Sequence, residues 1–161
     1  MDIVKLIKDR RTIKKFKHEQ VKQEDILTWL NTAAMSPNHR MTEPWKILFV
    51  GENTRKSLNH KTNFGNAPVL FAVLSHKGSS DLARDENLMS TACFIQNFML
   101  QAWATGAGVF WSSLGATDAA RKILSVPDDY DVAGILAAGI PDEIPVAKPR
   151  TPIDSKIEYL K

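Results

Sequence analysis

The feature that most constrains the fold is residues 82–105, which are predicted to form one long helix with apolar residues on most of its circumference. Ser79, Ser80 and Asp81 precede it as N-cap candidates, and Gly106 ends it. Such a helix requires burial on several sides, so we expect it either inside the core of one chain or against a second copy. Among its apolar side chains, Cys93 is most simply a core residue; the full set is Leu88, Met89, Ala92, Cys93, Phe94, Ile95, Phe98, Met99, Leu100 and Trp103.

The remaining periodic segments predict a mixed α/β domain with a central sheet. Helical spacing of apolar residues indicates helices at 2–9, 23–35, 52–62 and 119–125. Short apolar runs bounded by turn residues indicate buried strands at 45–50, 68–74, 109–111 and 132–140. At 161 residues and 43% hydrophobic content, the chain fits one domain over residues 1–161.

Beyond the last strand, prolines interrupt the chain too often for a helix. They predict an extended arm over residues 141–161 with apolar residues near its tip. An arm of this kind usually packs on something, and a partner subunit is a natural candidate. The prolines are Pro141, Pro145, Pro149 and Pro152.

Composition limits the classes of function. The formal net charge of +3 comes without dense basic blocks, so a small anionic ligand explains it better than nucleic acid. One cysteine, Cys93, permits no intramolecular disulfide and no multi-cysteine metal site. We find no signal-peptide pattern and no apolar run of ~18 residues, so we expect a soluble cytoplasmic protein without a membrane span.

Four segments carry side chains suited to a bound anion and a flat ring. Arg10, Arg11 and Thr12 supply two guanidinium groups and a hydroxyl, which suit a phosphate and the polar edge of a ring. The others are Ser36-Pro37-Asn38-His39 with Glu43-Pro44-Trp45, the stretch 106–113, and Gly139-Ile140-Pro141 with Lys148-Pro149-Arg150. In their order and spacing, these segments resemble small single-domain members of the nitroreductase family over nearly the whole chain.

The resemblance implies a nitroreductase-like α/β (α+β) fold, with a central mixed sheet surrounded by helices, and an intertwined homodimer with the flavin at the interface. It implies non-covalent FMN as cofactor and NADH or NADPH as electron donor. Hydride would pass by ping-pong kinetics through the flavin N5 to a nitroaromatic, a quinone or a similar flat acceptor. The chain lacks a dinucleotide-binding glycine fingerprint, which is compatible with a donor that docks only transiently over the flavin.

The resemblance also assigns roles at the N-terminal segment and the tail. Arg10 would hold the FMN phosphate, and Arg11 and Thr12 the phosphate or the ring carbonyls. From the tail, Arg150 would reach the phosphate, with Lys148 as the alternate. On the residues alone, the Arg pair also fits a solvated helix end, because cations suit a helix C-terminus, and the tail cations fit a basic surface segment.

The resemblance places Pro37, Asn38 and His39 against the flavin of the other subunit, where His39 could also contact the acceptor as an acid or a hydrogen-bond donor. Composition alone fits a polar loop after a helix stop. Several close relatives carry a basic residue where this chain has Met35. This departure puts one cross-subunit phosphate contact in question, for which Arg40 is a candidate substitute.

The resemblance makes Trp111, Ser112 and Ser113 line the flavin ring, with a backbone N–H in or just after this stretch near N5. A fixed donor there would stabilise the charge that N5 gains on reduction. The alternative from the residues is a core strand followed by a turn.

Two other functions remain open on this sequence. A flavin-handling protein on the same fold, either a carrier or a flavin-fragmenting enzyme, would treat reduced flavin as its substrate. An anion- or nucleic-acid-binding module would use the N-terminal cations and bind with steep salt dependence. The four histidines lack metal-ligand spacing, so no metal site is predicted. The cations in question are Arg10, Arg11, Lys14, Lys15 and Lys17.

Overall fold

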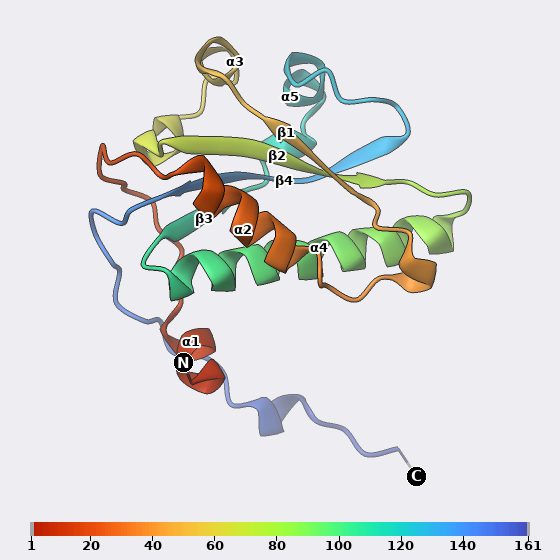
Figure 1. Ribbon diagram of the computed structural model, residues 1–161. Coiled ribbons are helices and arrows are strands. Elements are labelled where there is room, and N and C mark those ends of the chain that lie inside the picture. The colour runs from red at the N-terminus through yellow and green to blue at the C-terminus, as the bar shows by residue number, and fades with distance from the viewer. Residues whose placement is uncertain (1, 161) are drawn as a thin grey trace.

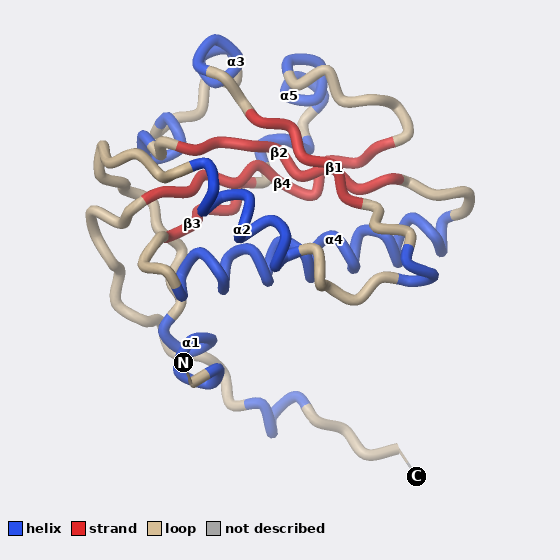
Figure 2. Tube along the Cα trace, in the orientation of Figure 1, coloured by secondary structure: helices blue, strands red, loops and turns tan. Residues whose placement is uncertain are grey.

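The computed structural model describes residues 2–160, which are built around a four-stranded sheet (Figures 1 and 2). The strands lie in the order β1-β2-β4-β3, and all three pairings are antiparallel. The predicted central sheet is confirmed, and within the described residues its parallel component is a single bridge between Thr12 and Val109. The strands are β1 Trp45–Phe49, β2 Val69–His76, β3 Gly108–Ser112 and β4 Tyr130–Gly139.

Helices cover both faces of the sheet, and the sheet divides the hydrophobic core into two layers (Figure 1). Alternate residues of β2 enter each layer, as expected for a strand that is buried on both faces. Val69, Phe71 and Val73 face the layer under α2 (Gln23–Ala33) and α4 (Asp81–Ala104). The intervening residues Leu70, Ala72 and Leu74 face the layer that includes α5 (Asp118–Ile123) and the end of α3 (Glu52–Ser57).

The long helix α4 forms where the sequence predicts it, and it begins at the predicted cap. The Ser80 hydroxyl accepts a hydrogen bond from the backbone N–H of Ala83, at 3.2 Å. On its inner side Phe94 stacks on Trp45, with 5.0 Å between ring centroids. On its outer side Met89 and Cys93 are exposed. The prediction of a core position for Cys93 is therefore wrong, because Cys93 lies on the side of α4 that neither the sheet nor α2 covers.

Helices α2, α3 and α5 end earlier than their patterns predict. The segment 52–62 is helical only to Ser57, since Asn59 adopts φ 46° and the ring of His60 then accepts the backbone N–H of Phe64. Helix α2 ends at Ala33 in place of residue 35. The short helix α1 spans Ile3–Asp9, close to its prediction.

The N-terminal segment after α1 runs beside β3 and then beside the end of β4. The backbone N–H of Ile13 donates to the Val109 carbonyl at 3.1 Å, and that of Lys17 donates to the Ile140 carbonyl at 3.0 Å. Lys15 pairs with Glu143 at 2.8 Å. Past these contacts, residues 142–160 are exposed and carry one short 3-10 helix, Ile153–Lys156. Figure 1 shows this segment leaving the body of the molecule.

Within residues 2–160, no helix is both long enough and apolar enough to cross a membrane.

Candidate functional site

The strongest candidate for a ligand contact is Arg10, which follows the last residue of α1. Its side chain is half-buried, and its Nη1 atom is buried without a hydrogen-bond partner among the described residues. Burial, followed by the charges of Arg11 and Arg150, lowers the pKa of Arg10, although a guanidinium remains protonated in proteins. A buried donor without an acceptor, beside two further cations, is an arrangement that an anion would satisfy.

Arg11 has a different local role from Arg10. Its Nη1 donates to the Lys8 carbonyl at 2.7 Å and to the Arg10 carbonyl at 3.0 Å. These bonds cap the C-terminal end of α1, where a cation also meets the helix dipole favourably. The helix-end interpretation of the Arg pair therefore describes Arg11, whereas Arg10 is left with unused hydrogen-bonding capacity.

The tail and β3 meet this N-terminal segment. Of the two candidate tail cations, Arg150 is the one whose charge contributes to the lowered pKa of Arg10, although the two residues are far apart in sequence. Lys148 is exposed. Thr12 is exposed and forms the bridge to Val109 on β3, so it lies beside the strand that leads to Trp111.

The stretch Trp111–Ser113 is held firmly against β4. The indole Nε1 of Trp111 donates to the Ala133 carbonyl at 3.0 Å, and the ring lies directly over Gly134. A Cβ at Gly134 would be 2.0 Å from Nε1, so this close approach requires glycine. The indole nevertheless stays 37% exposed. Ser112 is buried, with its hydroxyl accepting from the Leu114 N–H at 3.3 Å, and Ser113 is exposed.

The turn that contains Pro37, Asn38 and His39 is organised by its own side chains. Asn38 donates to the Ser36 carbonyl at 3.3 Å and accepts the Glu43 backbone N–H at 2.9 Å, so both ends of its amide are engaged inside the turn. Pro37 and His39 are exposed. His39 lines a cleft of about 760 Å³ between the 3-10 turn η1 (His39–Met41) and the start of α4.

Within one chain, this turn and the end of α1, which carries Arg10 and Arg11, lie at opposite ends of α4 (Figure 1). The Thr42 side chain bonds Asn87, in the second turn of α4, whereas Thr12 pairs with Val109 just beyond the other end of the helix. At 1.5 Å per residue, the path from Asn87 to Ala104 is about 25 Å. One chain therefore presents the two halves of the predicted site far apart.

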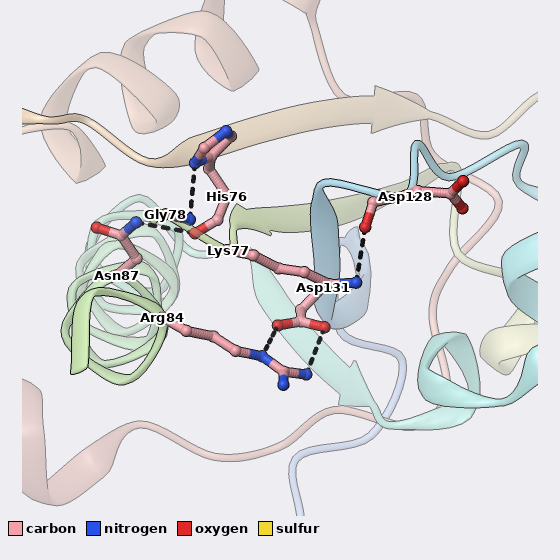
Figure 3. Close-up of polar contacts among 7 residues, drawn as sticks. All are labelled: His76, Lys77, Gly78, Arg84, Asn87, Asp128 and Asp131. Atoms are coloured by element: carbon pink, nitrogen blue, oxygen red, sulfur yellow. Dashed lines mark hydrogen bonds and ion pairs between the residues drawn. The ribbon is translucent and has the colours of Figure 1, made fainter. Parts of the chain in front are cut away.

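A second cleft, of about 640 Å³, lies between the start of α4 and the start of β4. Two of its basic side chains bond within the chain: Arg84 makes a bidentate ion pair with Asp131, at 2.6 and 2.9 Å, and the Lys77 ammonium donates to the Asp128 carbonyl at 2.6 Å (Figure 3). Arg84 is the main cause that lowers the pKa of Asp131. This arrangement is structural, since it joins α4 to β4 and to the loop before it.

Comparison with known proteins identifies the family. A family model described as the nitroreductase family matches the chain over residues 7–62 and 52–140. The chain belongs to the nitroreductase family. The Bacillus subtilis (strain 168) protein YfhC, provisionally named an NAD(P)H nitroreductase, is 33% identical over 172 residues, which cover 92% of this chain and 89% of YfhC.

Solved structures of the nitroreductase family share the fold over nearly the whole chain. A nitroreductase-like family protein from Bacillus cereus superposes with a TM-score of 0.90 at 29% identity, covering 100% of this chain and 97% of that one. A protein from Exiguobacterium sibiricum 255-15, provisionally described as a nitroreductase and solved in complex with FMN, gives 0.87 at 16% identity, covering 99% and 98%.

The sequence patterns did not predict a role for two residues, Asn87 and Thr42, that bond to each other in this fold. Asn87 is only 7% exposed within α4, where it contacts both the 37–44 segment and β2. Thr42 is its partner in that segment. An asparagine inside an otherwise apolar helical pattern is a signal of a buried polar contact, but the pattern does not reveal what the amide bonds. Within residues 2–160, no group of three or more metal-ligating side chains gathers.

Proposed function

We propose that this nitroreductase-family protein is an FMN-dependent oxidoreductase that takes electrons from NADH or NADPH and delivers them to a nitroaromatic, a quinone or a similar flat acceptor. The observation that carries the proposal is the buried Nη1 of Arg10, which has no partner in the described structure and has two other guanidinium groups nearby. A phosphate carries nearly two negative charges at neutral pH and several acceptor oxygens, so it fits this cluster.

The residues present fit FMN in type and order. Arg10 and Arg150 would hold the phosphate, while Arg11 and Thr12 would reach the phosphate or the ring carbonyls. The Trp111–Ser113 stretch would lie along the ring, since it ends the strand that Thr12 borders. The FMN named in the E. sibiricum complex and the NAD(P)H in the name of YfhC support the cofactor and the donor.

We further propose that the working unit is a homodimer in which Pro37, Asn38 and His39 of one chain complete the site of the other. Support comes from the separation of the two halves along α4 and from the apolar residues Leu82, Met89 and Cys93, which α4 leaves exposed in one chain. The exposed segment 142–160 ends in apolar residues and would pack on the partner. With one cysteine, the protein suits the reducing cytoplasm.

When bound, FMN would accept a hydride from the nicotinamide and pass reducing equivalents to the acceptor. The protein would bind and orient the cofactor, and the rigid Trp111–Ser113 backbone would supply a donor that does not reorganise during reduction. His39 would contact the cofactor or the acceptor from the partner side. We further propose that the site tolerates many flat acceptors, and a narrow profile across a panel of quinones and nitro compounds would contradict this.

The first test is the visible absorption spectrum of the purified protein loaded with FMN, before and after NADH or NADPH is added without oxygen. The proposal expects a flavin spectrum that bleaches. A protein that takes up no FMN would contradict it and favour the anion-binding module. A flavin that is retained but reduced only slowly would favour a carrier or a flavin-fragmenting enzyme.

The matched variants for this test are Arg10→Ala and Lys8→Ala, which each remove one cation from the same segment. Loss of charged hydrogen bonds to phosphate should weaken FMN binding roughly tenfold to a hundredfold in Arg10→Ala. Lys8 is exposed and its side chain makes no bond within residues 2–160, so Lys8→Ala should bind like wild type. Equal FMN affinity in the two variants would show that the phosphate lies elsewhere.

A further inference from the structure

The turn that carries His39 has an unusual backbone. Arg40, Met41 and Glu43 adopt φ values of 52°, 54° and 45°, in the left-handed region that side chains other than glycine rarely occupy. Three such residues within four positions require an environment that holds them there, and strain of this kind gathers at ligand-binding segments. Two sets of contacts fix this turn.

One set of contacts lies within the turn and its entry into the sheet. The Asn38 side chain accepts the Glu43 backbone N–H at 2.9 Å, which closes the turn across its strained residues. The Pro44 carbonyl accepts the His76 N–H at 2.9 Å, so the chain joins the sheet immediately after the turn. These bonds fix the end of the turn and its internal closure.

A second set ties the turn to α4 through one buried amide. The Thr42 hydroxyl donates to the Asn87 Oδ1 at 3.3 Å, and the Asn87 Nδ2 donates to the His76 carbonyl at 2.8 Å (Figure 3 shows the second bond). Because the His76 carbonyl can only accept, it sets the orientation of the amide, and the amide oxygen faces Thr42. Gly78 confirms how closely Asn87 is packed, since a Cβ there would lie 3.3 Å from Nδ2.

This arrangement leaves the side chains of His39 and Arg40 exposed at the surface of the turn. Neither side chain makes a hydrogen bond or an ion pair within residues 2–160. They border the cleft of about 760 Å³ that Thr42 and Asn87 also line. The strained, anchored turn therefore presents two side chains whose hydrogen-bonding groups are unused within residues 2–160.

We propose that Asn87 and Thr42 are positioning residues that hold His39 and Arg40 ready to contact the FMN bound by a second copy. This inference rests on the proposed function. Arg40 then supplies the cross-subunit cation that the family resemblance leads us to expect at the position of Met35, which is 80% exposed in this chain. Neither Asn87 nor Thr42 touches the cofactor; each acts through the turn.

The test measures the rate at which FMN dissociates from Thr42→Val, which removes only the hydroxyl link, and from Asn87→Asp, which removes the donor to His76. Thr28→Val is the matched control, because the Thr28 hydroxyl also donates a single hydrogen bond, to the Glu24 carbonyl, but lies on α2. We expect Thr42→Val to release FMN roughly three- to tenfold faster, as the loss of one neutral hydrogen bond allows, and Thr28→Val to match wild type.

A thermodynamic cycle separates positioning from general stability. In a protein that already carries His39→Ala and Arg40→Gln, the turn has nothing left to present, so adding Thr42→Val should not change FMN release further. If Thr42→Val accelerates release equally in both backgrounds, or leaves the wild-type rate unchanged, the inference is wrong. A wild-type protein that takes up no FMN would overturn the proposed function and this inference together.

Discussion

At the scale of single residues, His60 is the histidine whose environment sets a clear direction for its titration. Its ring stacks on Phe64 with 4.1 Å between centroids, and its Nδ1 accepts the backbone N–H groups of Phe64 and Thr62 at 3.1 and 3.3 Å. Burial lowers the pKa of His60. Protonation at Nδ1 would also replace an acceptor by a donor and break both bonds.

This environment predicts that His60 makes the protein less stable in mild acid. The unfolded chain takes up the proton near the ordinary pKa of about 6.5, whereas the folded chain takes it up only at lower pH. The free energy of unfolding therefore carries the full contribution of His60 above about pH 6.5. This contribution falls as the pH drops below that value, until the lowered pKa of the folded chain is reached. Urea unfolding at pH 7.5 and pH 5.5 measures this loss.

The variant His60→Gln keeps an acceptor but cannot titrate. It should be less stable at pH 7.5, because the ring packing is lost, but its stability should change less between the two pH values. His18→Gln, at an exposed position, serves as the control for replacing a histidine. An unchanged pH dependence in His60→Gln would refute this account.

Residue types in the predicted site were readable from sequence, but their individual environments were not. Two adjacent arginines after a short helix suggest both an anion site and a helix end, and the structure divides these roles between Arg10 and Arg11. The choice depends on which guanidinium is buried, and that depends on how residues distant in sequence pack around the end of α1. Contacts made across so many residues leave no periodic trace in the chain.

At the scale of elements, apolar periodicity predicts the helices and strands well but not their arrangement. Every β2 residue from Val69 to Ser75 is buried, which the continuous apolar run indicates. The order β1-β2-β4-β3 places β3 at the sheet edge beside β4, and that order depends on pairing registers such as Val109 with Ala138. The 3-10 turns were missed because side-chain caps and left-handed residues, as at His60 and Arg40, create them.

The ion pair of Arg84 with Asp131 is the side-chain link between α4 and β4 that can be tested most directly. Because Arg84 lowers the pKa of Asp131, the pair stabilises the fold above the ordinary carboxyl pKa of 3.8. That contribution is lost as the pH falls through the lowered pKa. Asp131→Asn should therefore have a lower urea midpoint than wild type between pH 5 and pH 7, by the small margin of a solvent-screened pair.

The gap between Asp131→Asn and wild type should begin to narrow below about pH 4, where the carboxyl starts to be protonated. The matched control is Glu52→Gln, which breaks a fully exposed helical pair with Lys56 and should leave the midpoint nearly unchanged at neutral pH. A gap that stays constant down to the lowest pH at which both proteins fold would assign the effect to packing rather than to charge.

At the scale of the whole molecule, one chain leaves apolar side chains exposed along α4 and in the tail. Met89 is 60% exposed in the middle of α4, and Cys93 lies one turn further along the same side of the helix. Exposed apolar patches of this kind mark protein contacts. The tail adds further apolar side chains, which are Ile144, Val146, Ile153, Ile157, Tyr159 and Leu160. A second copy that covers α4 would also bring the two halves of the proposed site together.

This arrangement predicts that Met89→Glu separates the dimer, because a charge would be buried at the contact. Light scattering after size exclusion should give the mass of one chain for Met89→Glu and of two for wild type and for Met89→Leu, which keeps the apolar surface.

The Cys93 thiol provides an independent readout: it should react slowly with a thiol reagent in the wild-type dimer and much faster in Met89→Glu. FMN retention should fall with dimerisation, since each site would lose the partner's turn. Wild-type protein that runs as a single chain with a fast-reacting thiol would show that α4 is free, and the two halves of the site would then need another route to meet.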